Sequence, residues 1–309
     1  MRLAILGIGA MGCLLGARLN PYADVTLIGS WAEQIKALQR APLRVIHPDG
    51  REDLVRLRVS TGTEADAPAD VALIVTKTVK TRQAAQTAAR LLAPDGIALT
   101  LQNGLGNLEV IAQEVGMERA ALGVTTLGAA LDGPGVLRPG GNGVTTLAVR
   151  PEIEPQIRTL AALFEQAGLP VEVTPDARGA LWGKLAVNAA INPLTALLGV
   201  PNGALLESAA AREIMREAAR ETAAVAAAQG ISLPFDDPPA RAEQVARQTA
   251  HNRSSMWQDL RRGAPTEIDA ICGAVAQTGE RLGVPVPVNT LLWRLVRAAE
   301  DMRNARLPA

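Results

Sequence analysis

One lysine and two asparagines stand in an otherwise apolar stretch, W-G-K-L-A-V-N-A-A-I-N-P-L-T-A-L-L, between residues 182 and 198. On a helix, Lys184 and Asn188 share a face because they are one i,i+4 step apart, and Asn192 follows one turn later. An ammonium among Ala, Leu and Val side chains is poorly solvated, which moves its pKa toward the working range of a proton donor. A second interpretation stays open, in which Lys184 snorkels to solvent while Asn192 caps a new helix with Pro193 at its first position.

A glycine motif, G-I-G-A-M-G, lies between a strand-like run at residues 2–6 and a helix-like run at residues 13–19. In such a motif the first glycine permits a tight turn, the second lets a pyrophosphate approach the backbone, and the third lets helix and strand pack closely. We therefore expect this loop to contact a dinucleotide through Gly7, Ile8, Gly9, Ala10, Met11 and Gly12.

Three further loops follow predicted strands at the edge where such sheets bind ligands. After the strand at residues 24–28, Gly29-Ser30-Trp31 offers neither the acid that holds the ribose of NAD nor the arginine that holds the 2′-phosphate of NADP. Ser30 can donate a hydrogen bond to a phosphate, and Lys36 or Arg40 can supply a cation, although both also fit a solvated helix surface. Lys77 follows the strand at residues 71–76, and the loop Gln102-Asn103-Gly104-Leu105-Gly106 follows the strand at residues 97–101. We expect ligand contact at both places.

Strands and helices alternate through the N-terminal half, which predicts a parallel, doubly wound sheet. We expect hairpins within residues 43–59 and 120–149 to extend that sheet. The segment 168–176 holds one short strand between two prolines and marks the domain boundary. The predicted fold class is α/β, with a Rossmann-type dinucleotide-binding domain at 1–174 and an all-α substrate domain at 175–309.

The pattern of the second domain predicts helices at 177–190, 193–198, 208–229, 239–252, 255–262, 267–282 and 289–303. The S-x-x-Q sequence from Ser255 to Gln258 is a capping box, so Ser255 either caps its helix or holds an anion there. Glu267 is likewise either a first-turn acid favoured by the helix dipole or a member of a site.

Composition narrows the class of protein. Lys+Arg 31 equals Asp+Glu 31, and only 2% of the 309 residues are aromatic, so no footprint for nucleic acid is visible. The two cysteines, Cys13 and Cys272, stand in different halves, which fits a reducing compartment and offers no metal site. Strand-like residues begin at Arg2 and no uncharged apolar run has the length of a membrane span. We expect a cytoplasmic protein without membrane partners.

Several motifs occur in a specific order: G-I-G-A-M-G, V-T-K, Q-N-G-L-G, the run W-G-K-L-A-V-N-A-A-I-N-P-L-T-A-L, V-P-N-G, S-S-M-W-Q-D and T-E-I-D. With them the chain resembles the ketopantoate reductase family nearly end to end. The resemblance implies NADPH-dependent reduction of 2-dehydropantoate to pantoate in pantothenate biosynthesis. It thus implies that the binding partner is a small-molecule substrate, a 2-keto acid. A homodimer is one expected assembly.

The resemblance also assigns roles to matching positions. Lys184 matches the general acid. Substrate contacts match Asn188, Asn192, Asn202 and Ser255, while Asn103 matches a residue that touches cofactor and substrate. Cofactor contacts match Gly7 to Gly12, Lys77 and Ala129, and Glu267 matches an acid on the nicotinamide side. Ser30 departs from the family, since members that prefer NADPH usually have arginine there, so NAD is an alternative cofactor.

Two other functions fit the same residues. One is a related NAD(P)-dependent dehydrogenase that acts on another 2-keto or 3-hydroxy acid. The other is a dinucleotide-binding sensor without turnover.

Overall fold

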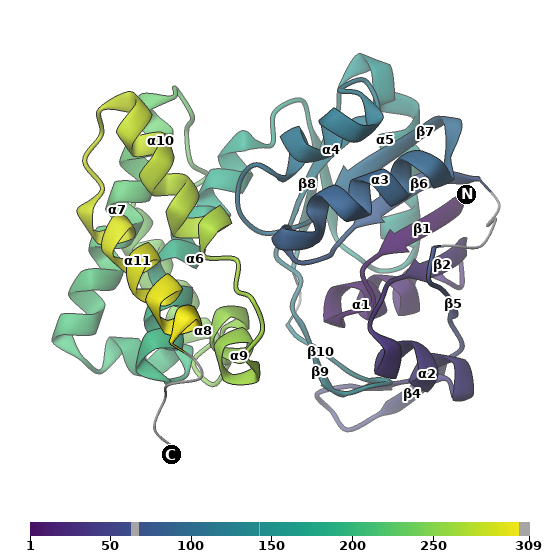
Figure 1. Ribbon diagram of the computed structural model, residues 1–309, viewed down its shortest axis with the longest axis horizontal. Helices are drawn as coiled ribbons and strands as arrows, with labels where there is room; N and C mark the ends of the chain where they lie inside the picture. Colours follow the sequence, from purple (N-terminus) through teal and green to yellow (C-terminus); the bar gives the residue numbers. More distant parts are fainter. Residues whose placement is uncertain (63–67, 142, 303–309) are drawn as a thin grey trace. The chain divides into compact units, whose positions relative to one another are not determined.

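The computed structural model describes residues 1–62, 68–141 and 143–302, and Figure 1 labels their helices and strands. It contains two compact units, one of residues 1–102 and 107–177, the other of residues 103–106 and those from 178 onward. The loop 103–106 therefore belongs to the second unit although it interrupts the first in sequence.

The first unit is built on a large sheet. Among the described residues its strands are β1 (Arg2–Leu6), β2 (Asp24–Ile28), β5 (Arg58–Ser60), β6 (Ala69–Ile74), β7 (Leu92–Thr100), β8 (Ala120–Thr125), β11 (Thr145–Ala148) and β12 (Val171–Thr174). Their order is β12-β11-β8-β7-β6-β1-β2-β5. The strands from β8 to β5 pair in parallel, whereas β11 runs antiparallel to β8. The expected parallel α/β sheet is confirmed.

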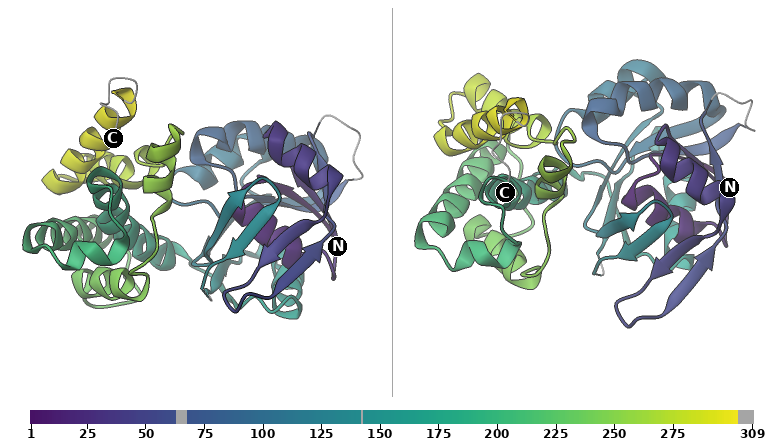
Figure 2. Two further views of the ribbon diagram at one scale, coloured as in Figure 1. Left: turned by 90° about the horizontal axis from the view of Figure 1, so that it is seen from below. Right: turned by 60° about the horizontal axis from the view of Figure 1, so that its bottom comes forward.

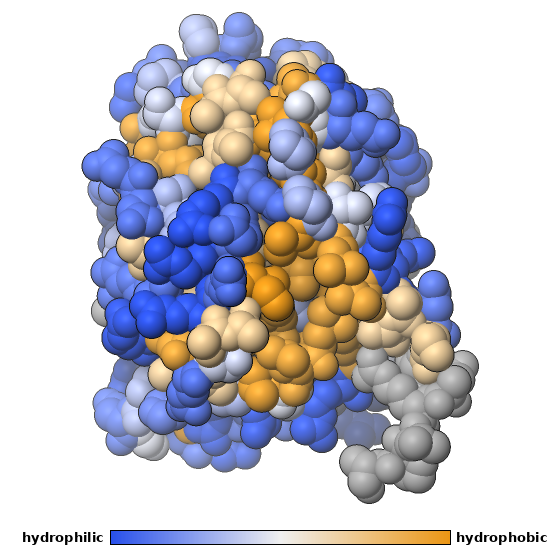
Figure 3. All heavy atoms as spheres, turned by 90° about the vertical axis from the view of Figure 1, so that its left-hand side faces the viewer, coloured by the Kyte–Doolittle hydropathy of each residue, from blue (hydrophilic) through white to orange (hydrophobic). Residues whose placement is uncertain are grey.

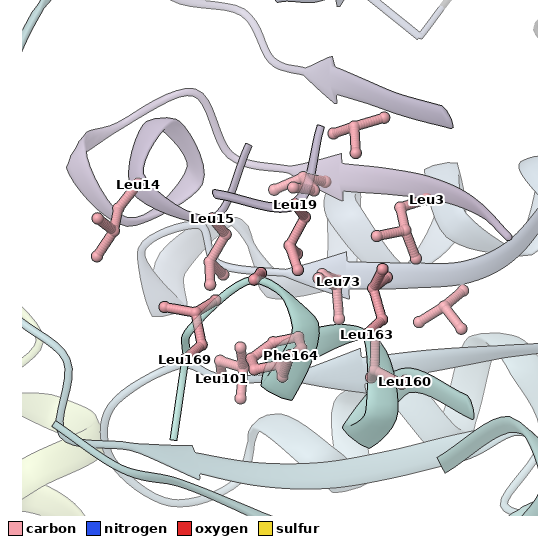
Figure 4. Packing of buried hydrophobic residues seen from close by; sticks show 14 of the residues in the cluster. Leu3, Leu14, Leu15, Leu19, Leu73, Leu101, Leu160, Leu163, Phe164 and Leu169 are labelled. Atoms are coloured by element: carbon pink, nitrogen blue, oxygen red, sulfur yellow. The ribbon is translucent and has the colours of Figure 1, made fainter. Parts of the chain in front are cut away.

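Alternate side chains of the central strands enter two different cores, as the two-residue period of a strand requires. Leu3 and Ile5 of β1 pack with α1 (Ala10–Leu19), α2 (Ala32–Arg40) and α5 (Glu154–Gln166), and Figure 4 shows part of this cluster. Ala4 and Leu6 pack instead with α3 (Thr81–Leu91) and α4 (Asn107–Val115). Helices therefore cover both faces of the sheet.

The hairpin prediction is correct only in part. Strands β5, β8 and β11 join the large sheet, but β3 (Leu43–Ile46), β4 (Glu52–Val55), β9 (Ala129–Gly133) and β10 (Val136–Pro139) form a separate sheet in the order β4-β3-β10-β9. Figure 2 shows this smaller sheet from two further directions. Its Leu43, Val45 and Leu137 enter the same core as α1. The smaller sheet thus covers α1, whose apolar surface the large sheet alone leaves exposed.

Helices joined by loops make up the second unit within its described residues. Its elements are α6 (Arg178–Leu198), η3 (Asn202–Leu206), α7 (Ala209–Ala228), α8 (Pro238–Gln248), α9 (Ser255–Arg262), the π-helical turn η4 (Asp269–Gly273), α10 (Ala274–Leu282) and α11 (Pro287–Asp301). Their apolar faces form one core around α6. The helix predicted from 289 to 303 overlaps α11, which begins two residues earlier, and Arg303 lies outside the described residues.

A continuous α6 replaces the two helices expected at 177–190 and 193–198, so Asn192 is not an N-cap. Pro193 has no N–H to donate to Ala189, which normally breaks or kinks a helix. Here the Cys272 thiol donates to the Ala189 carbonyl oxygen, with Sγ and O 3.8 Å apart. The thiol, a weak donor from another element, thus satisfies the carbonyl oxygen that Pro193 leaves without a partner. The apolar packing of α6 holds the helix together.

Apolar side chains gather on the face of the helical unit shown in Figure 3. The large hydrophobic residues exposed on this unit are Leu198, Ile214, Leu282, Leu291, Leu295 and Met302.

No helix within the described residues combines the length and apolar character needed to cross a membrane. The expected homodimer stays a prediction.

Candidate active site

The strand register brings the predicted cofactor loops to one edge of the large sheet. Leu6 pairs with both Ile28 and Ile74, and Ile74 pairs with Thr100. The residues that follow these four strand ends include Gly7, Ser30, Lys77 and Gln102. The carboxyl edge of a parallel sheet is where such folds bind ligands. Ala129 lies elsewhere in the first unit, at the start of β9 in the smaller sheet.

The glycine loop, defined here as Gly7–Gly12, can exist only without side chains at two of its glycines. Gly7 has a φ of +129° and lies against the backbone of Val75, and a Cβ on Gly12 would lie 1.7 Å from the Gly7 carbonyl oxygen. Ile8 is buried against Gly29, where a Cβ would meet Ile8 Cγ1 at 2.7 Å. Gly7 and Gly12 therefore fix the turn from β1 into α1.

Gly9 has a different environment. A Cβ on Gly9 would meet nothing within 4 Å, so this glycine faces open space. Gly9 is also the N-cap of α1 and provides no side-chain cap, so the N–H groups of the first turn are available to a ligand. Open space beside uncapped amides at a helix N-terminus fits the pyrophosphate of a dinucleotide.

A buried amide, Gln102, connects two of the strand-end loops. Its Nε2 donates to the Thr76 carbonyl oxygen at 2.9 Å and to Thr81 Oγ1 at 2.9 Å. Thr81 Oγ1 in turn donates to Asn107 Oδ1 at 2.9 Å. This network attaches the loop that carries Lys77 to the end of β7.

Lys184 lies partly buried on α6, on a turn flanked by buried Trp182 and Leu185. Burial lowers its pKa from 10.5 to about 8, and the negative charge of Glu267 opposes that effect. Within the described residues the ammonium makes no hydrogen bond or ion pair. A lysine that titrates in this range can both donate and accept a proton near neutral pH.

Glu267 brings the loop 103–106 to Lys184. Asn103 Nδ2 donates to Glu267 Oε2 at 3.0 Å, and the Leu105 amide donates to the Ala270 carbonyl oxygen at 2.9 Å. Glu267 is only 5% exposed. We call Lys184, Asn103 and Glu267 the Lys184 cluster. Its members come from three separate parts of the sequence but belong to one compact unit.

Amide side chains extend along α6 from Lys184. Asn188 is half-buried and Asn192 is buried one turn further along the same helix. Thr195 Oγ1 donates to Ser254 Oγ at 2.7 Å, which attaches α9 to this part of α6. The two predicted asparagines therefore follow Lys184 on a continuous helix.

Asn202 begins η3 and is held on two sides. Its Nδ2 donates to Thr249 Oγ1 at 2.9 Å, and its backbone N–H donates to the Asn252 carbonyl oxygen at 3.0 Å. Asn202 Oδ1 is buried and has no hydrogen-bond partner within the described residues. A buried acceptor without a partner is uncommon, and a ligand hydroxyl group can satisfy it.

Ser254, not Ser255, caps α9. Ser254 Oγ accepts a hydrogen bond from the Trp257 amide at 3.1 Å, and Gln258 Nε2 donates to the Arg253 carbonyl oxygen at 3.1 Å. The expected capping box at Ser255 is therefore wrong, because the chain enters the helix one residue earlier. Ser255 stands exposed in the first turn, where hydroxyl and amide groups together can bind an anion.

Comparison with known protein families covers most of the chain. Residues 3–152 match the family described as ketopantoate reductase PanE/ApbA, and residues 176–300 match the C-terminal part of the same family. The 2-dehydropantoate 2-reductase of Halobacterium salinarum is 39% identical over 97% of this chain and 99% of its own length. The enzyme of that name from Pyrococcus horikoshii is 36% identical over 98% of each chain.

Solved structures show the same likeness. A PanE/ApbA family ketopantoate reductase from Ralstonia eutropha superimposes with a TM-score of 0.89 at 34% identity, over 98% of this chain and 100% of the other. A ternary structure of D-mandelate dehydrogenase with NADH and anilino(oxo)acetate gives a TM-score of 0.92 at 30% identity, over 98% and 100%.

Proposed function

The chain belongs to the ketopantoate reductase family, and from this premise we propose that it catalyses the NADPH-dependent reduction of 2-dehydropantoate to pantoate, in pantothenate biosynthesis. The observation that carries the proposal is the partly buried Lys184 with its lowered pKa, beside the Glu267–Asn103 pair. Reduction of a ketone places negative charge on its oxygen, and a cation that can release a proton stabilises that charge.

Lys184 is the proton donor in this proposal. When bound, the nicotinamide cofactor supplies the hydride to the keto carbon. As the carbonyl π bond breaks, Lys184 Nζ gives a proton to the oxygen, and the neutral amine then recovers a proton from solvent. The product is the 2-hydroxy acid, and the desolvated environment of Lys184 makes this proton transfer accessible near neutral pH.

The other predicted residues hold the reactants. Asn188, Asn192, Asn202 and Ser255 bind the substrate, whose hydroxyl group can satisfy the orphaned Asn202 Oδ1. Glu267 maintains the charge on Lys184 and orients the Asn103 amide. The cofactor contacts are Gly7 to Gly12, Lys77, Asn103 and Ala129. The open space at Gly9 supports this assignment, since a pyrophosphate needs close approach to the backbone. The proposed location is the cytoplasm, and the proposed assembly is a homodimer.

A second candidate is a dehydrogenase for another 2-keto acid. The likeness to D-mandelate dehydrogenase with NADH favours it, as does Ser30 in place of the arginine usual in members that prefer NADPH. A sensor without turnover is less well supported, because such a protein has no need of a proton donor with a pKa near 8.

Paired rate measurements on the purified full-length chain test the proposal. We expect 2-dehydropantoate to be reduced with NADPH, at a higher kcat/KM than with NADH, and pantoate to be the product by mass spectrometry. A panel that includes phenylglyoxylate is the control for substrate. Clear preference for another keto acid would favour the second candidate. Dinucleotide binding without reduction of any keto acid would favour the sensor.

A further inference from the structure

Two residues from different strand ends meet beside the end of β2. Ser30 follows β2, and Lys80 ends η1 (Thr78–Lys80), which follows β6. Strands β2 and β6 lie on either side of β1, so their carboxyl ends reach the same edge of the sheet. Lys80 Nζ donates to Ser30 Oγ at 3.3 Å. A lysine distant in sequence thus stands at the position that reads the adenosine ribose in dinucleotide-binding folds.

The charge of Lys80 is not compensated by an acid. Within the described residues, Lys80 Nζ has the Ser30 hydroxyl as its hydrogen-bond partner. No carboxylate oxygen of these residues lies within 4.0 Å of it, the distance that defines an ion pair. Neighbouring cations of the same unit are paired: Arg82 contacts Glu114 at 2.6 Å, and Arg58 contacts Asp24 at 3.0 Å. The residues around Ser30, Gly29 and Trp31, are uncharged. The Ser30–Lys80 contact is therefore a locally cationic group with a hydroxyl donor.

We propose that Lys80 and Ser30 together recognise the 2′-phosphate of NADPH. Lys80 supplies the positive charge from the β6 side of the sheet, and Ser30 adds a hydroxyl donor where an arginine after β2 is usual. The inference rests on the proposed function, which needs a nicotinamide cofactor, and adds how the chain distinguishes NADPH from NADH. A lysine can serve here because it binds phosphate as a point charge.

The sequence alone offers Lys36 and Arg40 as rival cations. Both are exposed on α2, and neither makes a hydrogen bond to Ser30 within the described residues. The contact of Lys80 with Ser30 therefore favours Lys80 over these two, and variants can separate them.

Binding of nucleotide fragments tests the inference without catalysis. Isothermal titration calorimetry would compare 2′,5′-ADP with 5′-AMP, which differ by the 2′-phosphate. For Lys80→Gln we expect about tenfold or greater loss of affinity for 2′,5′-ADP, the scale of a hydrogen bond to a charged group, and unchanged affinity for 5′-AMP. Lys80→Arg should retain the preference, Ser30→Ala should lose part of it, and Lys36→Gln is the matched control with the same loss of charge.

Each alternative outcome has a definite meaning. The inference is overturned if the wild-type chain binds both fragments equally, if Lys80→Gln retains the preference, or if Lys36→Gln loses it equally. Reduction of 2-dehydropantoate with NADH would leave the proposed reaction standing in those cases. Conversely, loss of 2′-phosphate binding in Lys80→Gln together with no reduction of any keto acid would support the inference and remove the proposed function.

Discussion

In the first unit the glycine loop offers backbone amides at positions without side chains, whereas in the second unit the Lys184 cluster consists of ionisable and amide side chains. At Gly12 a single Cβ would lie 1.7 Å from a backbone oxygen, and at Gly9 it would enter open space. At Lys184 burial lowers the pKa to about 8, with Glu267 opposing the shift. We therefore expect added atoms in the glycine loop to weaken cofactor binding, and removed atoms in the Lys184 cluster to lower kcat.

The largest expected effect is on the Lys184 cluster. Removing the proton donor with Lys184→Ala should lower kcat by roughly a hundredfold or more, the scale of losing a general acid. Because the ammonium has no hydrogen bond or ion pair within the described residues, Tm and cofactor affinity should change little. Steady-state kinetics, thermal unfolding and calorimetry measure the three quantities.

Lys184→Met is the matched control for the apolar stem, and Lys36→Ala is the control for loss of one positive charge on the other unit. Both Lys184 variants should lose kcat alike, while Lys36→Ala keeps it. A near-wild-type kcat in the folded Lys184→Ala protein would remove the assignment of Lys184 as proton donor.

The glycine loop should respond in the opposite way, through binding and not through kcat. Gly9→Ala adds a methyl group where the structure leaves open space, at a φ of −76° that any residue adopts. We expect the fold to be unchanged and the Kd for NADPH to rise about tenfold, since small misplacements at a site are costly. Calorimetry with NADPH and a thermal melt of the same sample measure both.

Gly12→Ala is the comparison within the loop. Its Cβ must displace the backbone at Gly7, so it should lower Tm as well as cofactor affinity. Equal affinity of Gly9→Ala and wild type for NADPH would show that the space at Gly9 does not receive the pyrophosphate.

The same contrast explains what the sequence could predict. A glycine loop is a local motif, and β1, β2 and the glycine loop that follows β1 lie where the pattern predicts. The other two members of the Lys184 cluster are not local: Asn103 and Glu267 are 164 residues apart and meet only in the folded unit. The Asn103–Glu267 contact was therefore not predicted from spacing, although both residues were selected by resemblance.

The errors have physical causes of the same kind. The break expected at Pro193 is absent because apolar packing holds α6 together, and Cys272, distant in sequence, donates to the Ala189 carbonyl oxygen that the proline leaves without its usual partner. Ser254 and not Ser255 caps α9, and the Ser254 hydroxyl also contacts Thr195, which is distant in sequence. The local pattern predicts that both segments are helical, but not that α6 continues through Pro193 or that Ser254 provides the cap of α9.

The smallest expected effect is on the pH dependence of kcat, when Glu267→Gln removes the negative charge that influences Lys184. Reduction needs the ammonium form of Lys184, so kcat in the wild-type chain should be highest below pH 8 and fall as pH rises through about 8. Oxidation of pantoate needs the amine form and should show the opposite trend. In Glu267→Gln the influence that raises the Lys184 pKa is lost, so the falling limb of kcat should move to lower pH.

Glutamine keeps the Asn103 contact while it removes the charge, because its amide oxygen can accept the same hydrogen bond from Asn103 Nδ2. If the falling limb moves by about one pKa unit, the ammonium fraction at pH 8 falls severalfold, and kcat at pH 8 falls with it. At a pH well below both values Lys184 is fully protonated, so the two proteins should then have similar kcat. A uniform loss across the whole pH range would instead show that Glu267 acts by holding Asn103 in place and not through the charge of Lys184.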